Sequence, residues 1–373
     1  MLRKTFKILA LLGLAVLLQF GCTSAATSDT SGTTILYVYD AASNAVLSWD
    51  SISTLFTSGS ASPDRTITCS KLSDFALAWG GMALDSSAQY LYLVSTDGTV
   101  VRISQIGDQS GTVSSSDVIS FTLDDSDTSI SSGVFGQAAV TPDGSMLYVT
   151  ECASSSGGTS QIWAIPLSSM SSGASFGSGY AVATTSGLGG DKAGTGVAAS
   201  SSYLFAYFNT GDTTVSSTEY TGARLRRGTT SGSFSASSSL IAGESGNTTT
   251  LLGKYGCLAY DTDNDYLYVA RHNTDASMTA GSSPLLAFKP GDFGGSVEVA
   301  PDATFTGPDD LRIIAHAGKK DWIVGALANS SVGTPTLWIW KGLVASGSYV
   351  YLDLPATSTG SVVIKGLALD GSD

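Results

Sequence analysis

Short apolar segments recur along the chain, each followed by a polar turn and a second apolar segment. The first segment of each pair holds small and aliphatic residues, and the second is rich in Tyr, Leu and Val. Runs of this length, bounded by Gly, Asp and Ser, predict β-strands joined by tight turns. The clearest copies are Met82-Ala83-Leu84-Asp85 before Tyr90-Leu91-Tyr92-Leu93-Val94, Ala138-Ala139-Val140-Thr141-Pro142-Asp143-Gly144 before Met146-Leu147-Tyr148-Val149, and Leu258-Ala259-Tyr260-Asp261 before Tyr266-Leu267-Tyr268-Val269.

The second segments are nearly evenly spaced, which indicates an internal repeat. A third apolar segment follows each of them, as in Ala45-Val46-Leu47-Ser48-Trp49, so every copy predicts a small antiparallel sheet. Six copies of such a unit predict an all-β fold, a six-bladed β-propeller. The second segments begin at Leu36, Leu91, Leu147, Leu204, Leu267 and Trp322, in steps of 55 to 63 residues.

The first copy lacks its opening strand, and the C-terminus supplies a matching one. Gly366-Leu367-Ala368-Leu369-Asp370 closely resembles Gly81-Met82-Ala83-Leu84-Asp85, the opening strand of the second copy. A propeller can close its ring without open edges when one blade combines a strand from the N-terminus with a strand from the C-terminus. We therefore expect the N- and C-terminal strands to pair.

One segment carries a family resemblance. Pro142-Asp143-Gly144-Ser145-Met146-Leu147-Tyr148-Val149 resembles the Pro-Asp-Gly…Leu-Tyr-Val signature of bacterial YVTN-type and lactonase-like propellers. The likeness covers most of the mature chain and implies a propeller. Members of this group commonly have seven blades, so a seven-bladed ring is the alternative to the six counted here. They include enzymes and binding proteins, so the resemblance implies no single function.

The N-terminus has the pattern of an export signal. Arg3, Lys4 and Lys7 precede an apolar run at 8–18 that is too short to cross a bilayer as a helix. Gln19-Phe20-Gly21-Cys22 resembles a bacterial lipoprotein processing box, which implies a lipid on Cys22. Ordinary secretory cleavage after Ser24-Ala25-Ala26 is the alternative.

These features predict three parts of the chain. We expect a signal peptide at 1–21, a Ser/Thr-rich tether at 22–34 and a single propeller domain at 35–373. The protein would be exported and held at the cell envelope, with the lipid anchor as its only contact with the membrane.

Composition and charge narrow the choice of partner. The chain is 42% hydrophobic, only 13% charged and contains 43 Gly, which suits many short strands and turns. Its net charge is −13, and the expected leader holds three of the 18 basic residues. Because binding to phosphates rests on basic patches, we expect no nucleic-acid partner.

The remaining cysteines are odd in number for an oxidising compartment. Cys69, Cys152 and Cys257 allow at most one disulfide, and their spacing does not match a metal site. We expect small buried side chains, while the pairing of these cysteines stays open.

A recognition surface is expected on one face of the ring. Loops that enter the inner strands and loops that join second to third strands open on the same face, and long ones occur at about 151–160, 209–222 and 271–283. Long loops on a rigid scaffold suit a protein or glycan partner, although Ser/Gly-rich insertions without a function are the alternative. The candidate ligand-binding residues are Lys254, Tyr255, Arg271, His272 and Asp310.

The one cofactor that the sequence suggests is Ca²⁺. Asp261, Asp263 and Asp265 alternate as the first ligands of a calcium loop do. A hairpin turn is the stronger interpretation, because Asp and Asn favour turns unaided and the later Gly and Glu of such a loop are missing.

Evidence for catalysis is sparse. A hydrolytic triad needs a nucleophile with a positioned base, and His272 and His316 are the only histidines that could act as that base. His316 ends an innermost strand and is expected to be a packed core residue. A non-catalytic binding module is therefore the expected function. The alternative is a metal-dependent lactonase-like hydrolase at the channel mouth, with carboxylates drawn from Asp74, Glu151, Asp309 and Asp310.

Overall fold

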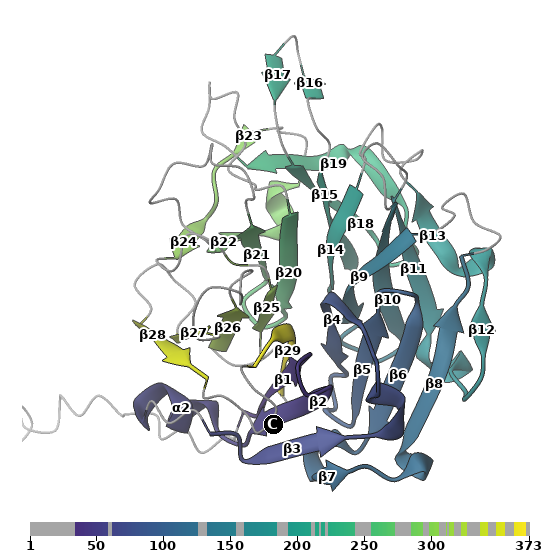
Figure 1. The fold of residues 1–373 in the computed structure, drawn as a ribbon. Coiled ribbons are helices and arrows are strands. Elements are labelled where there is room, and N and C mark those ends of the chain that lie inside the picture. The colour runs from purple at the N-terminus through teal and green to yellow at the C-terminus, as the bar shows by residue number, and fades with distance from the viewer. Residues whose placement is uncertain are drawn as a thin grey trace, which may run out of the picture. The chain divides into compact units, whose positions relative to one another are not determined.

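Six antiparallel sheets form the blades of a propeller in the computed structural model (Figure 1). From the innermost strand outward, blade 1 holds β29 (Ile364–Leu369), β1 (Leu36–Asp40), β2 (Ala45–Trp49) and β3 (Arg65–Thr68); blade 2 holds β4 (Leu77–Leu84), β5 (Tyr90–Ser95), β6 (Thr99–Ser104) and β8 (Val118–Leu123); and blade 3 holds β9 (Gly133–Val140), β10 (Met146–Ala153), β11 (Ser160–Pro166) and β13 (Ala181–Thr184).

The other three blades follow the same plan. Blade 4 holds β14 (Ala193–Ala199), β15 (Tyr203–Asn209), β18 (Ala223–Thr229) and β19 (Phe234–Ala242); blade 5 holds β20 (Tyr255–Asp261), β21 (Tyr266–His272), β22 (Leu285–Phe288) and β24 (Ala303–Phe305); and blade 6 holds β25 (Ile313–His316), β26 (Trp322–Ala326), β27 (Thr336–Lys341) and β28 (Ser348–Asp353). The predicted all-β, six-bladed fold is confirmed.

The structure describes most of one compact unit, Thr33–Ser372. It extends over 34–58, 62–125, 133–153, 160–184, 193–209, 213–215, 218–220, 223–242, 255–272, 285–293, 298–305, 311, 313–316, 322–326, 336–341, 348–354 and 362–370. Across these ranges, no helix has both the length and the apolar character that a membrane crossing needs.

The ring closes through the two ends of the chain. β1 pairs antiparallel with β29, so that Leu36 lies opposite Leu369 and Val38 opposite Leu367, and Figure 1 shows the two strands side by side. Backbone hydrogen bonds extend the pairing at both ends, from the N–H of Asp370 to the carbonyl of Ile35 and from the N–H of Ala41 to that of Val363. The predicted pairing of terminal strands is confirmed.

Each blade buries both of its faces against its neighbours. In β1, Tyr37 and Tyr39 pack with Leu91 and Leu93 of blade 2, while the alternate side chains join the cluster shared with blades 5 and 6. All five residues of β1 are buried, which explains why its sequence shows no alternation of apolar and polar positions. The innermost strands contact one another around the whole ring.

Short extra elements join neighbouring blades at their outer edges. In three blades a two-residue strand, donated by the next blade, pairs parallel with the outer strand. These strands are β7 (Gly111–Thr112) on β3, β12 (Ser175–Phe176) on β8 and β23 (Glu298–Val299) on β19. The described part of the chain also holds the helix α2 (Ile52–Ser58), the hairpin β16 (Thr213–Val215) and β17 (Thr218–Tyr220), and 3-10 turns at Ser70–Leu72, Ile106–Asp108, Ser115–Asp117, Leu167–Ser169, Ser178–Tyr180 and Pro290–Asp292.

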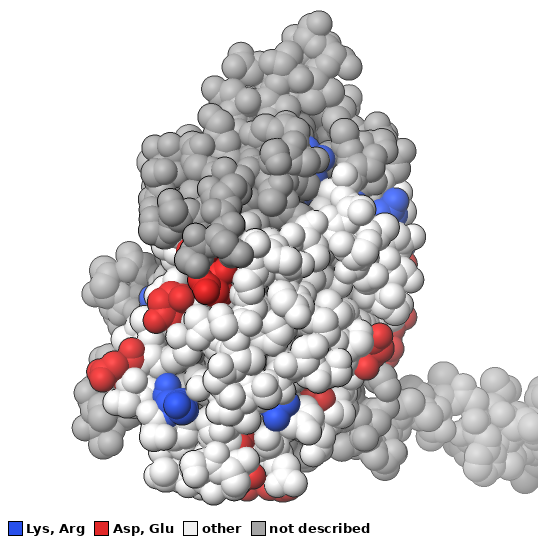
Figure 2. All heavy atoms as spheres, turned by 90° about the vertical axis from the view of Figure 1, so that its right-hand side faces the viewer, with Lys and Arg blue, Asp and Glu red and all other residues white. Residues whose placement is uncertain are grey.

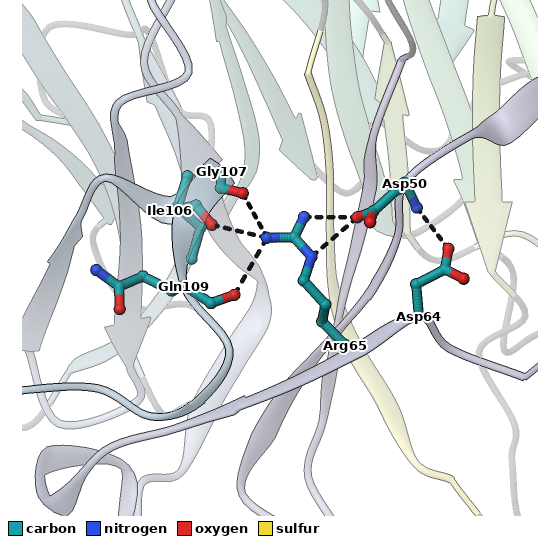
Figure 3. A network of polar contacts seen from close by, with 6 residues as sticks. All are labelled: Asp50, Asp64, Arg65, Ile106, Gly107 and Gln109. Atoms are coloured by element: carbon teal, nitrogen blue, oxygen red, sulfur yellow. Dashed lines mark hydrogen bonds and ion pairs between the residues drawn. The ribbon is translucent and has the colours of Figure 1, made fainter.

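Arg65 joins the first two blades next to β7 (Figure 3). Its Nη1 donates to the carbonyl oxygens of Gly107 at 2.5 Å and Gln109 at 3.1 Å. Both carbonyls belong to the turn segment that follows β6. Its Nε and Nη2 lie 2.9 and 2.7 Å from Oδ1 of Asp50, whose own N–H donates to Asp64. The five donors of a guanidinium suit this position, because a turn leaves several carbonyls without partners.

Two of the three cysteines are buried, as the sequence predicts, and Cys152 is partly exposed. No disulfide joins Cys69, Cys152 and Cys257, and both Cys69 and Cys257 are buried. Burial raises the pKa of the Cys257 thiol to about 12, so it is protonated at neutral pH.

Removing the closing strand should destabilise the whole propeller. Truncation before Val363 deletes buried Leu367 and Leu369 and exposes the edge of β1. Each buried leucine alone is worth about 2–5 kcal/mol. We expect the melting temperature in a circular dichroism scan to fall by at least about 10 °C, since 1 kcal/mol corresponds to a few degrees in a domain of this size. A chain truncated after Asp370 is the control, and an equal melting temperature for both truncations would contradict ring closure.

Candidate functional site

A small cavity lies in the central channel, where the six innermost strands end. Its volume is about 150 Å³, and small or aliphatic side chains make up most of its wall. The lining comes from all six blades, at 82–84, 137–140, 197–199, 258–260, 314–316 and 367–369. This end of the channel is opposite the predicted recognition face, because the inner strands run away from that face.

Gln137 links three blades across the channel wall. Its Oε1 accepts hydrogen bonds from the backbone N–H groups of Val197 at 3.0 Å and Leu258 at 2.9 Å, and its Nε2 donates to the carbonyl of Leu258 at 2.5 Å. The side chain is 5% exposed, so these bonds satisfy groups that water does not reach. A Cβ at Gly196 would lie 2.7 Å from the carbonyl oxygen of Gly256, so this close approach requires glycine.

His316 is a buried, neutral residue at the edge of the cavity, as the sequence predicts. Its ring stacks on Tyr268 with the centroids 5.2 Å apart, and its Nε2 lies 3.6 Å from Oδ2 of Asp261. Burial lowers the pKa of His316 to about 3, and burial also raises the pKa of Asp261. Because the His316 side chain is 1% exposed, it packs the core and is poorly placed to exchange protons with a substrate.

The alternating acidic residues after β20 form the predicted hairpin turn. Asp261 accepts hydrogen bonds from the N–H groups of Asp263 and Asn264, and Asp265 has a left-handed φ of 57°. Among the residues that the structure describes, no group of three or more His, Cys, Asp or Glu side chains could hold a metal ion. The carboxylate of Asp261 is thus used to build the turn, and Ca²⁺ binding at Asp261, Asp263 and Asp265 stays a prediction.

The structure brings three of the five candidate ligand-binding residues together. Tyr255, the first residue of β20, lies opposite His272, the last residue of β21, and Arg271 is opposite Gly256. Lys254 and Asp310 fall outside the described residues, as does Asp309. The ends of β20 and β21 therefore place a Tyr, an Arg and a His at adjoining positions on the predicted recognition face.

Other features of that face agree with the predicted arrangement. The loop at 209–222 contains the β16–β17 hairpin, which Figure 1 shows extending beyond β15 and β18. Near the start of the inner strands, the Lys365 Nζ lies 4.1 Å from the ring centroid of Trp79. Asp74, an exposed residue with a φ of 58°, lies just before β4. Most of the loop at 151–160 and of that at 271–283 falls outside the described residues.

Glu151 is a buried carboxyl at the edge of this face. It is 0% exposed, and its Oε2 accepts hydrogen bonds from Nε1 of Trp163 at 2.7 Å and from the Gln161 amide. Burial raises the pKa of Glu151 to about 7, against the effect of these bonds, and the nearby Asp125 carboxylate adds to the rise. Such a carboxyl changes charge near neutral pH.

Comparisons with known proteins identify no family. No protein-family model matches the sequence, and no curated protein matches it. Among solved structures, the chain is similar to one in "Crystal Structure of Mitotic Checkpoint Complex", with a TM-score of 0.38 and 11% identity over 77% of this chain and 78% of that one. It is also similar to the "WD40 beta propeller domain of Doa1", with a TM-score of 0.38 and 8% identity over 73% and 67%. At these values the propeller assignment rests on this chain's own strand order.

Glu151 should make stability fall as pH rises. Its folded-state pKa of about 7 exceeds the ordinary value of 4.5, so between these pH values the folded protein keeps a proton that the unfolded chain releases. The contribution of Glu151 to the free energy of unfolding is therefore largest below pH 4.5 and is lost as pH rises to about 7. In thermal melts, the melting temperature of the wild type should fall relative to Glu151→Gln from pH 5 to pH 8. A constant difference between the two proteins would show that Glu151 does not titrate in this way.

Proposed function

We propose that this protein is an exported, lipid-anchored interaction module that binds a protein or glycan partner through its long-loop face. One observation carries the proposal: a closed six-bladed ring places Tyr255, Arg271 and His272 at adjoining backbone positions, and the neighbouring blade 4 carries the projecting β16–β17 hairpin. Functional residues on loops held by a rigid scaffold are the usual arrangement of a recognition site.

The channel itself supports binding at the surface more than chemistry inside the ring. Its cavity of about 150 Å³ is smaller than the roughly 300–1,000 Å³ of small-molecule sites. Of the side chains that line it, His316 is the one histidine, and it is almost fully buried. The metal-dependent lactonase-like hydrolase, the alternative from the sequence, has no specific observation in its favour among the described residues.

Charge supports a partner other than nucleic acid. Figure 2 shows one face on which uncharged residues make up most of the described surface and the Lys and Arg side chains stand apart from one another. The net charge of the chain is −13. A partner would be bound through polar and aromatic groups instead of through a basic patch.

Site-specific photo-crosslinking in cells that make the full chain tests the recognition face. A photoreactive amino acid at His272 should give a discrete covalent adduct, which mass spectrometry of the excised band identifies. The same amino acid at Asn264, in the turn at the opposite end of the same two strands, is the matched control. Equal adducts from both positions, or none from His272, would remove the long-loop face as the binding surface.

Metabolic labelling tests the anchor separately. Cells given an alkyne-tagged fatty acid should label the wild-type protein and retain it in the membrane fraction. Cys22→Ser should be unlabelled and released, while Cys69→Ser, which changes a buried core thiol, should still be labelled. If Cys22→Ser stays in the membrane fraction as the wild type does, the lipid anchor is wrong.

A further inference from the structure

The outer edges of three blades are covered by a fifth strand in the same way. Each fifth strand comes from the connection between the third and fourth strands of the next blade and pairs parallel with the outer strand. β7 covers β3, β12 covers β8 and β23 covers β19. The propeller thus protects outer backbone groups by adding a short parallel strand.

Among the described residues, the outer strands β13, β24 and β28 have no such fifth strand, and β28 is the longest of them. The blade that follows β28 is blade 1, and the described part of its connection between third and fourth strands contains α2 and no strand. Ile52 and Leu55 hold this helix in the core, and its Phe56 packs edge-on against Trp322. Among the described residues, β28 therefore has a neighbour on one side only, β27.

The sequence of β28 lacks the usual protection of an edge strand. It pairs with β27 over six consecutive positions without a bulge, and it contains no Pro, Lys or Arg. Its one charged residue, Asp353, is at its end and accepts a hydrogen bond from Thr336. A regular edge strand that is rich in β-forming residues and has a single charge at its end is a template for another strand.

Exposed aromatic side chains lie along this edge. Tyr349 is 42% exposed and Tyr351 64% exposed, and across the described residues Val134 is the only other strongly exposed large hydrophobic side chain. Both tyrosine rings lie against Trp338 of β27, with centroids 5.5 and 5.6 Å apart. The alternate residues Val350 and Leu352 pack on the opposite, core side of the strand. Within the described residues, the edge thus combines a side without a paired strand and an aromatic surface beside it.

We propose that β28 is a docking site for an extended peptide segment of a protein partner, which pairs with it as β7, β12 and β23 pair with their outer strands. The segment would carry β-branched or aromatic residues at alternate positions, because these pack across strands against Tyr349 and Tyr351. Lys or Arg would suit its remaining positions, since the chain is acidic and Asp353 borders the edge. This site is separate from the long-loop face and does not depend on the function proposed for it.

A second copy of this chain fits the edge less well. Pairing of two six-residue β28 strands would bring two chains of net charge −13 together over a short contact. Stable dimers bury on the order of 1,200–2,000 Å² or more, which one short strand pair does not supply. A peptide strand needs no such area, because its backbone hydrogen bonds and the tyrosine contacts provide the affinity.

Peptide selection tests the proposal directly. Twelve-residue peptides from a random phage-displayed library would be selected on the folded protein, then synthesised with a fluorescent label and measured by polarisation. Selected peptides should alternate β-branched or aromatic residues, and their Kd should rise at least about tenfold for Tyr351→Lys. Val134→Lys, which changes an exposed side chain on β9, should bind them as the wild type does.

Hydrogen exchange provides a second readout that needs no variant. A bound peptide should slow exchange of the amides at 348–353 more than that of any other strand. The proposal would be overturned if the peptides bound Tyr351→Lys with the same affinity as the wild type. It would also be overturned if the bound peptide did not slow amide exchange in β28. Concentration-dependent dimerisation that Tyr351→Lys abolishes would also overturn it, with a second copy as the occupant.

Discussion

The pairing of β29 with β1 is the constraint on which the propeller depends. It joins residues more than 300 positions apart, so its formation closes a loop that contains the rest of the domain. Without it, blade 1 would lose its innermost strand and the ring would have two open edges. The side chains of β29 also form part of the channel wall, so the same pairing creates the cavity and holds blade 1 against blades 2 and 6.

Polar side chains, buried or partly buried, join the blades at points where apolar packing cannot satisfy the backbone. Gln137 connects blade 3 to the inner strands of blades 4 and 5, and Arg65 connects blade 1 to the turn after β6. Both residues donate to or accept from main-chain groups of another blade, and such contacts fix the position of one blade relative to the next. Glu151 is a different case, because burial of its carboxyl opposes ionisation and ties the contact between blades 2 and 3 to pH.

The sequence predicts the inner half of each blade well and the outer half poorly. The second strands repeat an aromatic-aliphatic pattern such as Tyr90-Leu91-Tyr92 because both faces are buried, and this pattern revealed the blade count. The outer strand β3, Arg65-Thr66-Ile67-Thr68, has one buried residue in four and is hard to distinguish from a polar loop. Two-residue strands such as β7 and the seven-residue helix α2 carry no pattern long enough to recognise.

The candidate site was predicted in part. Tyr255, Arg271 and His272 were predicted on one face, and the register of β20 and β21 puts their backbone positions next to one another. Their role in binding stays a prediction. The channel cavity at the opposite end was missed, because its wall of Ala, Val and Leu looks like any core strand. Gln137 gave a signal that was overlooked, a polar residue inside an otherwise small and apolar innermost strand. The raised pKa of Glu151 depends on the burial of its carboxyl and on the nearby Asp125, and only the folded structure shows either of them.

Hydrogen exchange of the intact protein tests ring closure most directly. Mass spectrometry of fragments covering 34–41 and 362–370 reports on the amides of β1 and β29 separately. Since the two strands form one ladder at the centre of the ring, both should exchange slowly, at the same rate, and through global unfolding. Rapid exchange in β29 while β1 remains protected by β2 would show that the C-terminal strand does not close the propeller.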